Sequence, residues 1–115
     1  MHRWITRAGY LVATAFALAW ALPLSRGRVR REAGLVVLTG LPRWAFGRGG
    51  TTVGGVYLTA SNDSPAVLRH EAVHRQQWLR HGLTMPIRYA LAGRDPARNR
   101  YEVEAGLEDG GYAAG

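Results

Sequence analysis

Residues 8–24 (AGYLVATAFALAWALPL) form an uncharged apolar run, and this run restricts the fold more than any other segment. A helix of this length is about 25 Å long, close to the shortest helix that crosses a membrane. Arg3 and Arg7 precede the run, and four arginines follow it between positions 26 and 31. Because the greater positive charge tends to stay in the cytoplasm, these arginines predict a single-pass anchor with a cytoplasmic C-terminal remainder.

Two other interpretations of residues 8–24 stay open. The small residues between positions 17 and 21 offer weak cleavage sites for a secretory signal peptide, although the arginines that follow oppose export. An Ala-rich helix could also simply pack on the rest of the protein. We divide the chain into an anchor-like segment, residues 1–31, and a domain, residues 32–115.

The chain has a formal net charge of +7, and all of its basic residues are arginines. Eight arginines and one acidic residue lie in residues 1–50, whereas residues 51–115 are balanced. A nucleic-acid-binding module should carry its basic patch on the folded body, so this distribution favours a membrane partner over nucleic acid. The absence of cysteine and lysine excludes disulfides, thiolate metal sites, cysteine nucleophiles and Schiff-base chemistry.

Two short segments favour strands. Residues 35–39 (LVVLT) and 51–59 (TTVGGVYLT) are rich in β-branched residues, and we expect them to pair as a short antiparallel ribbon. Gly54-Gly55 indicates a bulge or a close backbone approach within the second strand. Residues 26–34 are predicted to be a connector.

Helices are predicted after this ribbon. Ser64-Pro65 is a typical helix start, and the helix should run from about residue 65 to residue 81 and end at Gly82. A short helix or turn should occupy residues 85–92, and a last helix residues 96–109. The order of elements predicts an α+β fold preceded by an apolar helix.

The helix over residues 65–81 contains the sequence His70-Glu71-Ala72-Val73-His74, an H-E-x-x-H pattern. Residues four apart lie one above the other on a helix, so His70 and His74 can bind one metal ion from adjacent turns. A zinc ion held in this way activates a water, and Glu71 can act as its general base. Gln77 lies on the same face, where it could support a ligand or serve as a buried structural amide.

A third ligand is available on the last predicted helix, which carries Glu102 and Glu104. The two are separated by one residue, so only one of them can face the histidine pair squarely. We favour Glu102 and keep Glu104 as the alternative, with Glu108 as its supporting acid.

The pattern resembles the gluzincin metallopeptidases, most closely the membrane-associated type in which H-E-x-x-H is followed on a later helix by E-x-x-A-D. This resemblance covers roughly residues 51–109 and implies a minimal zincin-like domain with His70, His74 and Glu102 as zinc ligands and Glu71 as the base. Ala105 matches the alanine of the family pattern, but Gly106 stands where the family has an aspartate that supports a ligand.

The leading hypothesis is therefore a zinc-dependent metallohydrolase that acts on a peptide or protein substrate. The strand at residues 51–59 could hold that substrate in extended form. An alternative is a non-catalytic zinc-binding scaffold or sensor at the membrane. A third possibility is an arginine-rich membrane- or nucleic-acid-binding protein in which the motif is fortuitous.

Overall fold

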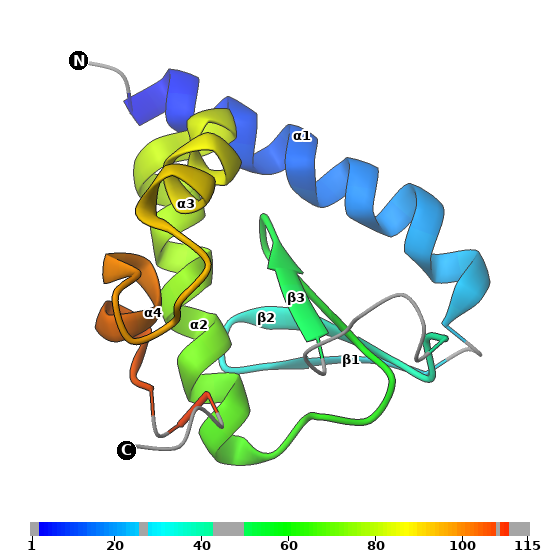
Figure 1. Cartoon of the computed structure of the whole chain (residues 1–115). Coiled ribbons are helices and arrows are strands. Elements are labelled where there is room, and N and C mark those ends of the chain that lie inside the picture. The colour runs from blue at the N-terminus through cyan, green and yellow to red at the C-terminus, as the bar shows by residue number, and fades with distance from the viewer. Residues whose placement is uncertain (1–2, 26–27, 43–49, 108, 111–115) are drawn as a thin grey trace.

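The computed structural model describes residues 3–25, 28–42, 50–107 and 109–110. It is an α+β arrangement, as predicted, in which helices pack on both faces of one four-stranded sheet (Figure 1). The strands are β1 (Arg28–Glu32), β2 (Leu35–Thr39), β3 (Gly50–Val53) and β4 (Val56–Thr59). Their spatial order is β1-β2-β4-β3.

The pairing of the strands corrects the predicted ribbon. β2 pairs with β4 in parallel, whereas the β1–β2 and β3–β4 pairs are antiparallel. The segment 51–59 is not one strand, because Gly54, with a φ of 60°, turns the chain between β3 and β4. β3 lies at the edge of the sheet, and β4 lies between β3 and β2. β4 therefore runs beside β2 in the same direction.

β1 occupies residues that were predicted to be a connector. Its sequence, RVRRE, carries four charges, which hides the strand from a hydropathy pattern. The position is tolerated because β1 lies at the edge of the sheet, where charged side chains reach solvent. A tight turn at Ala33 and Gly34, both with positive φ, then leads into β2.

The long helix α2 (Pro65–His81) has the predicted limits. The Ser64 hydroxyl accepts a hydrogen bond from the Val67 amide at 3.2 Å, and Gly82 ends the helix with a φ of 59°. A 3-10 turn, η3 (Gly82–Thr84), leads directly into α3 (Met85–Ala92), which is the predicted short helix.

The last helix, α4 (Arg100–Ala105), is much shorter than the predicted span 96–109. Asp95 caps only a turn, and the helix begins after Asn99, whose side-chain oxygen accepts hydrogen bonds from the amides of Tyr101 and Glu102. Asn99 is buried and its amide nitrogen donates to the carbonyls of Tyr89 and Gly93. These tertiary contacts fix the helix start at a residue that the local pattern did not favour.

The N-terminal helix α1 (Arg3–Ala21) is followed by a 3-10 turn, η1 (Leu22–Leu24). By length and composition this segment could cross a membrane. Its buried face consists of small residues spaced four apart, Gly9, Ala13, Ala17 and Ala21. Ala17 and Ala21 pack against Leu38, Val56 and Leu58 on one face of the sheet.

The opposite face of the sheet packs against α2. Leu35, Val37 and Tyr57 form a second buried cluster with Val67 and Leu68 of this helix. Because α2 is anchored to the sheet here, the histidines one and two turns farther along are held at a fixed position beside β3.

Candidate metal centre

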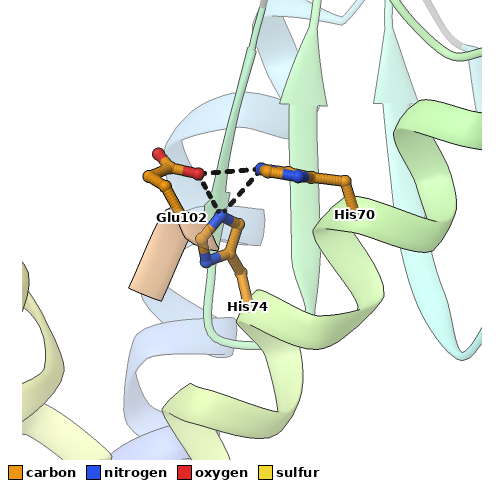
Figure 2. Close-up of side chains that lie close together, drawn as sticks. All are labelled: His70, His74 and Glu102. Carbon is orange, nitrogen blue, oxygen red and sulfur yellow. Dashed lines mark hydrogen bonds and ion pairs between the residues drawn. The ribbon is translucent and has the colours of Figure 1, made fainter. Parts of the chain in front are cut away.

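His70 and His74 of α2 and Glu102 of α4 point toward one another (Figure 2). Glu102 Oε1 lies 2.8 Å from His70 Nε2 and 2.9 Å from His74 Nε2, and the two nitrogens are 3.1 Å apart. All three residues are buried. Two nitrogens and one oxygen therefore converge on one point, and this group could hold a metal ion.

The hydrogen bonds on the other side of each imidazole determine which ring nitrogen carries hydrogen. His70 Nδ1 lies 2.7 Å from the Gly106 carbonyl oxygen, which can only accept, so Nδ1 is the donor. His74 Nδ1 likewise faces the Oε1 atom of Gln77 at 2.8 Å. Both Nε2 atoms consequently face Glu102 Oε1. A ring that is protonated at Nε2 donates a hydrogen bond to this oxygen, and a ring that has lost that proton directs its lone pair there, as a metal ligand requires.

The carbonyl of Gly106 supports the His70 ring through its hydrogen bond from Nδ1. Gly106 ends α4 with a φ of 99°, and its carbonyl oxygen also accepts from the Gly110 amide at 3.1 Å. A Cβ atom on Gly110 would lie 2.5 Å from His70 Cε1. The backbone of this turn therefore closes over the His70 ring and supports it without an acidic side chain.

Glu102 is held by a third partner, Tyr89 of α3, whose hydroxyl donates a hydrogen bond to Oε2. Burial disfavours the charged form of this carboxyl, but the hydrogen bonds from His70, His74 and Tyr89 outweigh it and hold the pKa of Glu102 well below its usual range. Glu102 is thus ionised, with Oε2 engaged by Tyr89 and Oε1 directed at the imidazoles.

The pKa of His74 shifts in the opposite direction to that of Glu102. Burial opposes its charged form, yet the hydrogen bond to Glu102 and the negative charges of Glu71 and Glu102 raise the pKa of His74 above its ordinary value. The site therefore favours a positive charge between Glu102 and the imidazoles, and a bound cation would replace a proton there.

Glu71 lies beside this group. Its Oε2 is 4.0 Å from His70 Nε2, and its Oε1 accepts a hydrogen bond of 2.7 Å from the Thr52 hydroxyl of β3. Burial raises the pKa of the Glu71 carboxyl, and the positive charge at His74 and the Thr52 bond partly offset the rise. A partly buried carboxylate with a raised pKa is suited to accept and return a proton.

Glu104 lies away from the histidines. Its side chain is half-exposed and forms an ion pair with Arg80 at 2.9 Å, and it accepts a hydrogen bond from Gln77 Nε2 at 2.7 Å. The alternative third ligand therefore does not join the group, and Glu108, its proposed supporting acid, lies outside the described residues.

The sequence pattern placed His70, His74 and Gln77 on one helix face and Glu102 on a later helix, but it missed Tyr89, Thr52 and the Gly106 carbonyl. Tyr89 is 13 or more positions from each of the three group members. Thr52 belongs to a strand whose pairing was not foreseen. The Gly106 contact is made by backbone, so no residue type signals it.

Comparison with protein-family models, curated proteins and solved structures finds no significant match.

Proposed function

We propose that this protein is a zinc-dependent hydrolase of amide bonds, most simply a peptidase, with His70, His74 and Glu102 as the metal ligands. The observation that carries the proposal is the convergence of two Nε2 atoms and one carboxylate oxygen beside a second, separate carboxylate, Glu71. Two imidazoles, one carboxylate and one open position are the donor set of catalytic zinc sites.

The measured spacing fits zinc after a small adjustment. Tetrahedral zinc holds its ligands at about 2.0–2.1 Å, which separates two ligand atoms by about 3.3 Å. The observed separations of 2.8, 2.9 and 3.1 Å need only a few tenths of an ångström of outward movement. When bound, zinc would polarise a substrate carbonyl and make a water acidic enough to attack it at neutral pH.

Glu71 would take the proton of the attacking water and then deliver it to the leaving amine. The Thr52 hydroxyl holds Oε1 of this carboxylate, which leaves Oε2 directed toward the histidines. Since burial raises the pKa of Glu71, the protonated carboxyl is also a competent acid in the second half of the reaction.

The gluzincin resemblance and a zincin-like fold are part of this proposal. They are supported by the H-E-x-x-H helix, by a glutamate on a later helix, and by the edge strand β3 next to the site. β3 pairs with β4 on one side, and a peptide in extended form could add along its other side, where it would displace the hydrogen bond that Trp78 Nε1 donates to the Thr52 carbonyl.

A second function is favoured by a different observation, the burial of the ligand group. The exposed fractions of His70, His74 and Glu102 are 1%, 8% and 4%. Structural zinc sites are closed in this way, whereas catalytic sites keep one position open to substrate. The alternative is therefore a zinc-stabilised scaffold or sensor domain that has no turnover.

Glu71→Gln separates these two functions. The variant keeps the shape of the side chain but cannot accept a proton, so a hydrolase should retain bound zinc and lose turnover by at least about a hundredfold. The measurements are metal content by mass spectrometry and hydrolysis of a mixed peptide library. Zinc in both proteins, with no cleavage by wild type, would contradict the hydrolase and favour the scaffold.

A further inference from the structure

The outward face of α1 carries a strip of exposed apolar side chains. Trp4 and Phe16 expose 73% and 67% of their surface, and Ile5, Leu11 and Val12 are about half exposed. Ala8, Ala15 and Ala19 fill the spaces between these side chains on the same face. The helix runs along one side of the molecule (Figure 1). A continuous exposed apolar strip along a whole helix is uncommon on a monomer and indicates a surface that binds a protein or a membrane.

The inner face of the same helix is fixed to the domain over its whole length. Near the N-terminus, a Cβ atom on Gly82 would lie 2.8 Å from Thr6 Cα. In the middle, the Thr14 hydroxyl accepts a hydrogen bond from the Gly55 amide at 2.9 Å. Near the C-terminus, Ala17 and Ala21 belong to the buried core beneath the sheet.

These contacts are too close to keep if α1 crosses a bilayer. A spanning α1 would either draw the β3–β4 turn and η3 into the hydrocarbon or leave the core without Ala17 and Ala21. Irregular backbone exposed to lipid carries unsatisfied polar groups and is strongly disfavoured. A helix that lies in the plane of the membrane surface keeps its inner contacts and still buries its outer face.

We propose that α1 is an in-plane docking helix that inserts its outer face into the surface of a bilayer rich in anionic lipids while its inner face stays packed on the domain. This inference replaces the single-pass anchor expected from the sequence, and it does not depend on the metal centre.

The charge of the protein selects the lipid surface. Arg3 and Arg7 are exposed one turn apart on α1, beside the apolar strip, and Arg31 is exposed on β1. Arginines beside the apolar strip can reach lipid phosphates, and each such charge strengthens binding to an anionic surface. A second copy of the chain is a poorer occupant, because two molecules with a net charge of +7 would repel each other.

Vesicle binding tests the proposal directly. The purified full chain should sediment with vesicles of phosphatidylcholine and phosphatidylglycerol, bind pure phosphatidylcholine at least about tenfold more weakly, and detach as salt rises from about 50 to about 500 mM. The double variant Leu11→Asp/Phe16→Asp should lower the binding constant by about a hundredfold or more. Val103→Asp, an exposed apolar position on α4, is the matched control and should bind like wild type.

Because both altered side chains in the double variant are exposed, the domain should still fold, and its circular dichroism should match that of wild type. Equal binding of the double variant and wild type would overturn the proposal. So would binding to neither kind of vesicle, or a wild-type dimer in solution that the double variant converts to monomer.

Depth measurements distinguish an in-plane helix from a spanning one. The chain has no cysteine, so spin labels can be placed singly through Ala8→Cys and Ala19→Cys on the exposed face. An in-plane helix should place both labels at the same shallow depth, about 5–10 Å below the headgroups. A spanning helix would separate their depths by about 16 Å, and that result would overturn the proposal.

Discussion

Gln77 Oε1 accepts a hydrogen bond from His74 Nδ1 at 2.8 Å, and this contact sets the direction of the His74 lone pair. The amide cannot turn over, because its nitrogen already donates to the Tyr101 carbonyl and to Glu104. Gln77 is fully buried one turn after His74 on the same helix, so the orientation of one ligand is built into α2.

Gln77→Met should weaken zinc binding by about 10- to 100-fold, the usual effect of losing the hydrogen bond behind a histidine ligand. Methionine fills a similar volume but cannot accept from Nδ1, so the His74 ring loses its preferred orientation. Competition with a chromogenic chelator measures the change in affinity. Gln76→Met alters the exposed neighbour on the same helix and should leave the affinity unchanged; an equal loss in both variants would contradict the role of Gln77.

The assignment of the third ligand is tested by a matched pair on α4. Glu102→Gln should abolish stoichiometric zinc binding, since it removes the carboxylate shared by both imidazoles. Glu104→Gln should keep zinc and lose only a surface ion pair, which contributes about 0–1 kcal/mol to the free energy of unfolding. Metal analysis of the two purified variants decides between them, and zinc lost only from the Glu104 variant would reverse the assignment.

Thr52→Val should shift the pH dependence of hydrolysis without changing zinc content. The Thr52 hydroxyl stabilises the ionised form of Glu71, so its removal should raise the pKa of Glu71 further. A base must be ionised to act, and the acidic limb of kcat/KM should therefore move to higher pH. Thr51→Val, at the exposed neighbouring position, should keep the wild-type profile. An unchanged limb in the Thr52 variant would argue against Glu71 as the base.

The stability of the metal-free protein should fall as pH rises. Folding raises the pKa of His74 above its ordinary value of 6.5, so this residue stabilises the fold fully below pH 6.5, and the contribution is lost as pH rises through the folded pKa. Melting temperatures of the chelator-treated protein should thus decrease as pH rises above 6.5.

Bound zinc should remove this loss of stability at higher pH, because the cation replaces the proton at His74. The pKa of His81 is lowered by burial and by nearby arginines, so its contribution has the opposite sign. His81→Gln should therefore keep or enlarge the alkaline loss, whereas His74→Gln should remove it. A loss that persists in the His74 variant would show that another group causes it.

Gly54 lies where the β3–β4 turn meets α1. Alanine there would require a positive φ of 60° and would place its Cβ 2.8 Å from the Thr14 amide nitrogen. Gly93→Ala is the matched control, because Gly93 also has a positive φ, but a Cβ atom there would have no atom of the described residues within 4 Å. Gly54→Ala should destabilise the protein by about 1–3 kcal/mol more than Gly93→Ala in urea unfolding. Equal effects would mean that α1 does not pack tightly on the turn.

Local signals in the sequence determined α2 and the alignment of its polar residues. A serine cap, a proline after it and a glycine at the end fix the helix, and the period of the helix then aligns His70, His74 and Gln77. α3 and β2 could also be predicted from the sequence, since each is a short segment bounded by turn residues. These features depend on interactions within a few residues of one another.

Only the tertiary structure decided which acid faces the histidines and how α1 is used. The choice of Glu102 over Glu104 depends on where Asn99 starts α4, and Asn99 is held by carbonyls of α3 and of the turn after it. The small face of α1 packs inward and its large side chains remain outside, because Gly9, Ala13 and their equivalents permit a closer approach than Leu11 or Phe16 would. Such outcomes depend on contacts between residues far apart in the chain, whose energies no local pattern encodes.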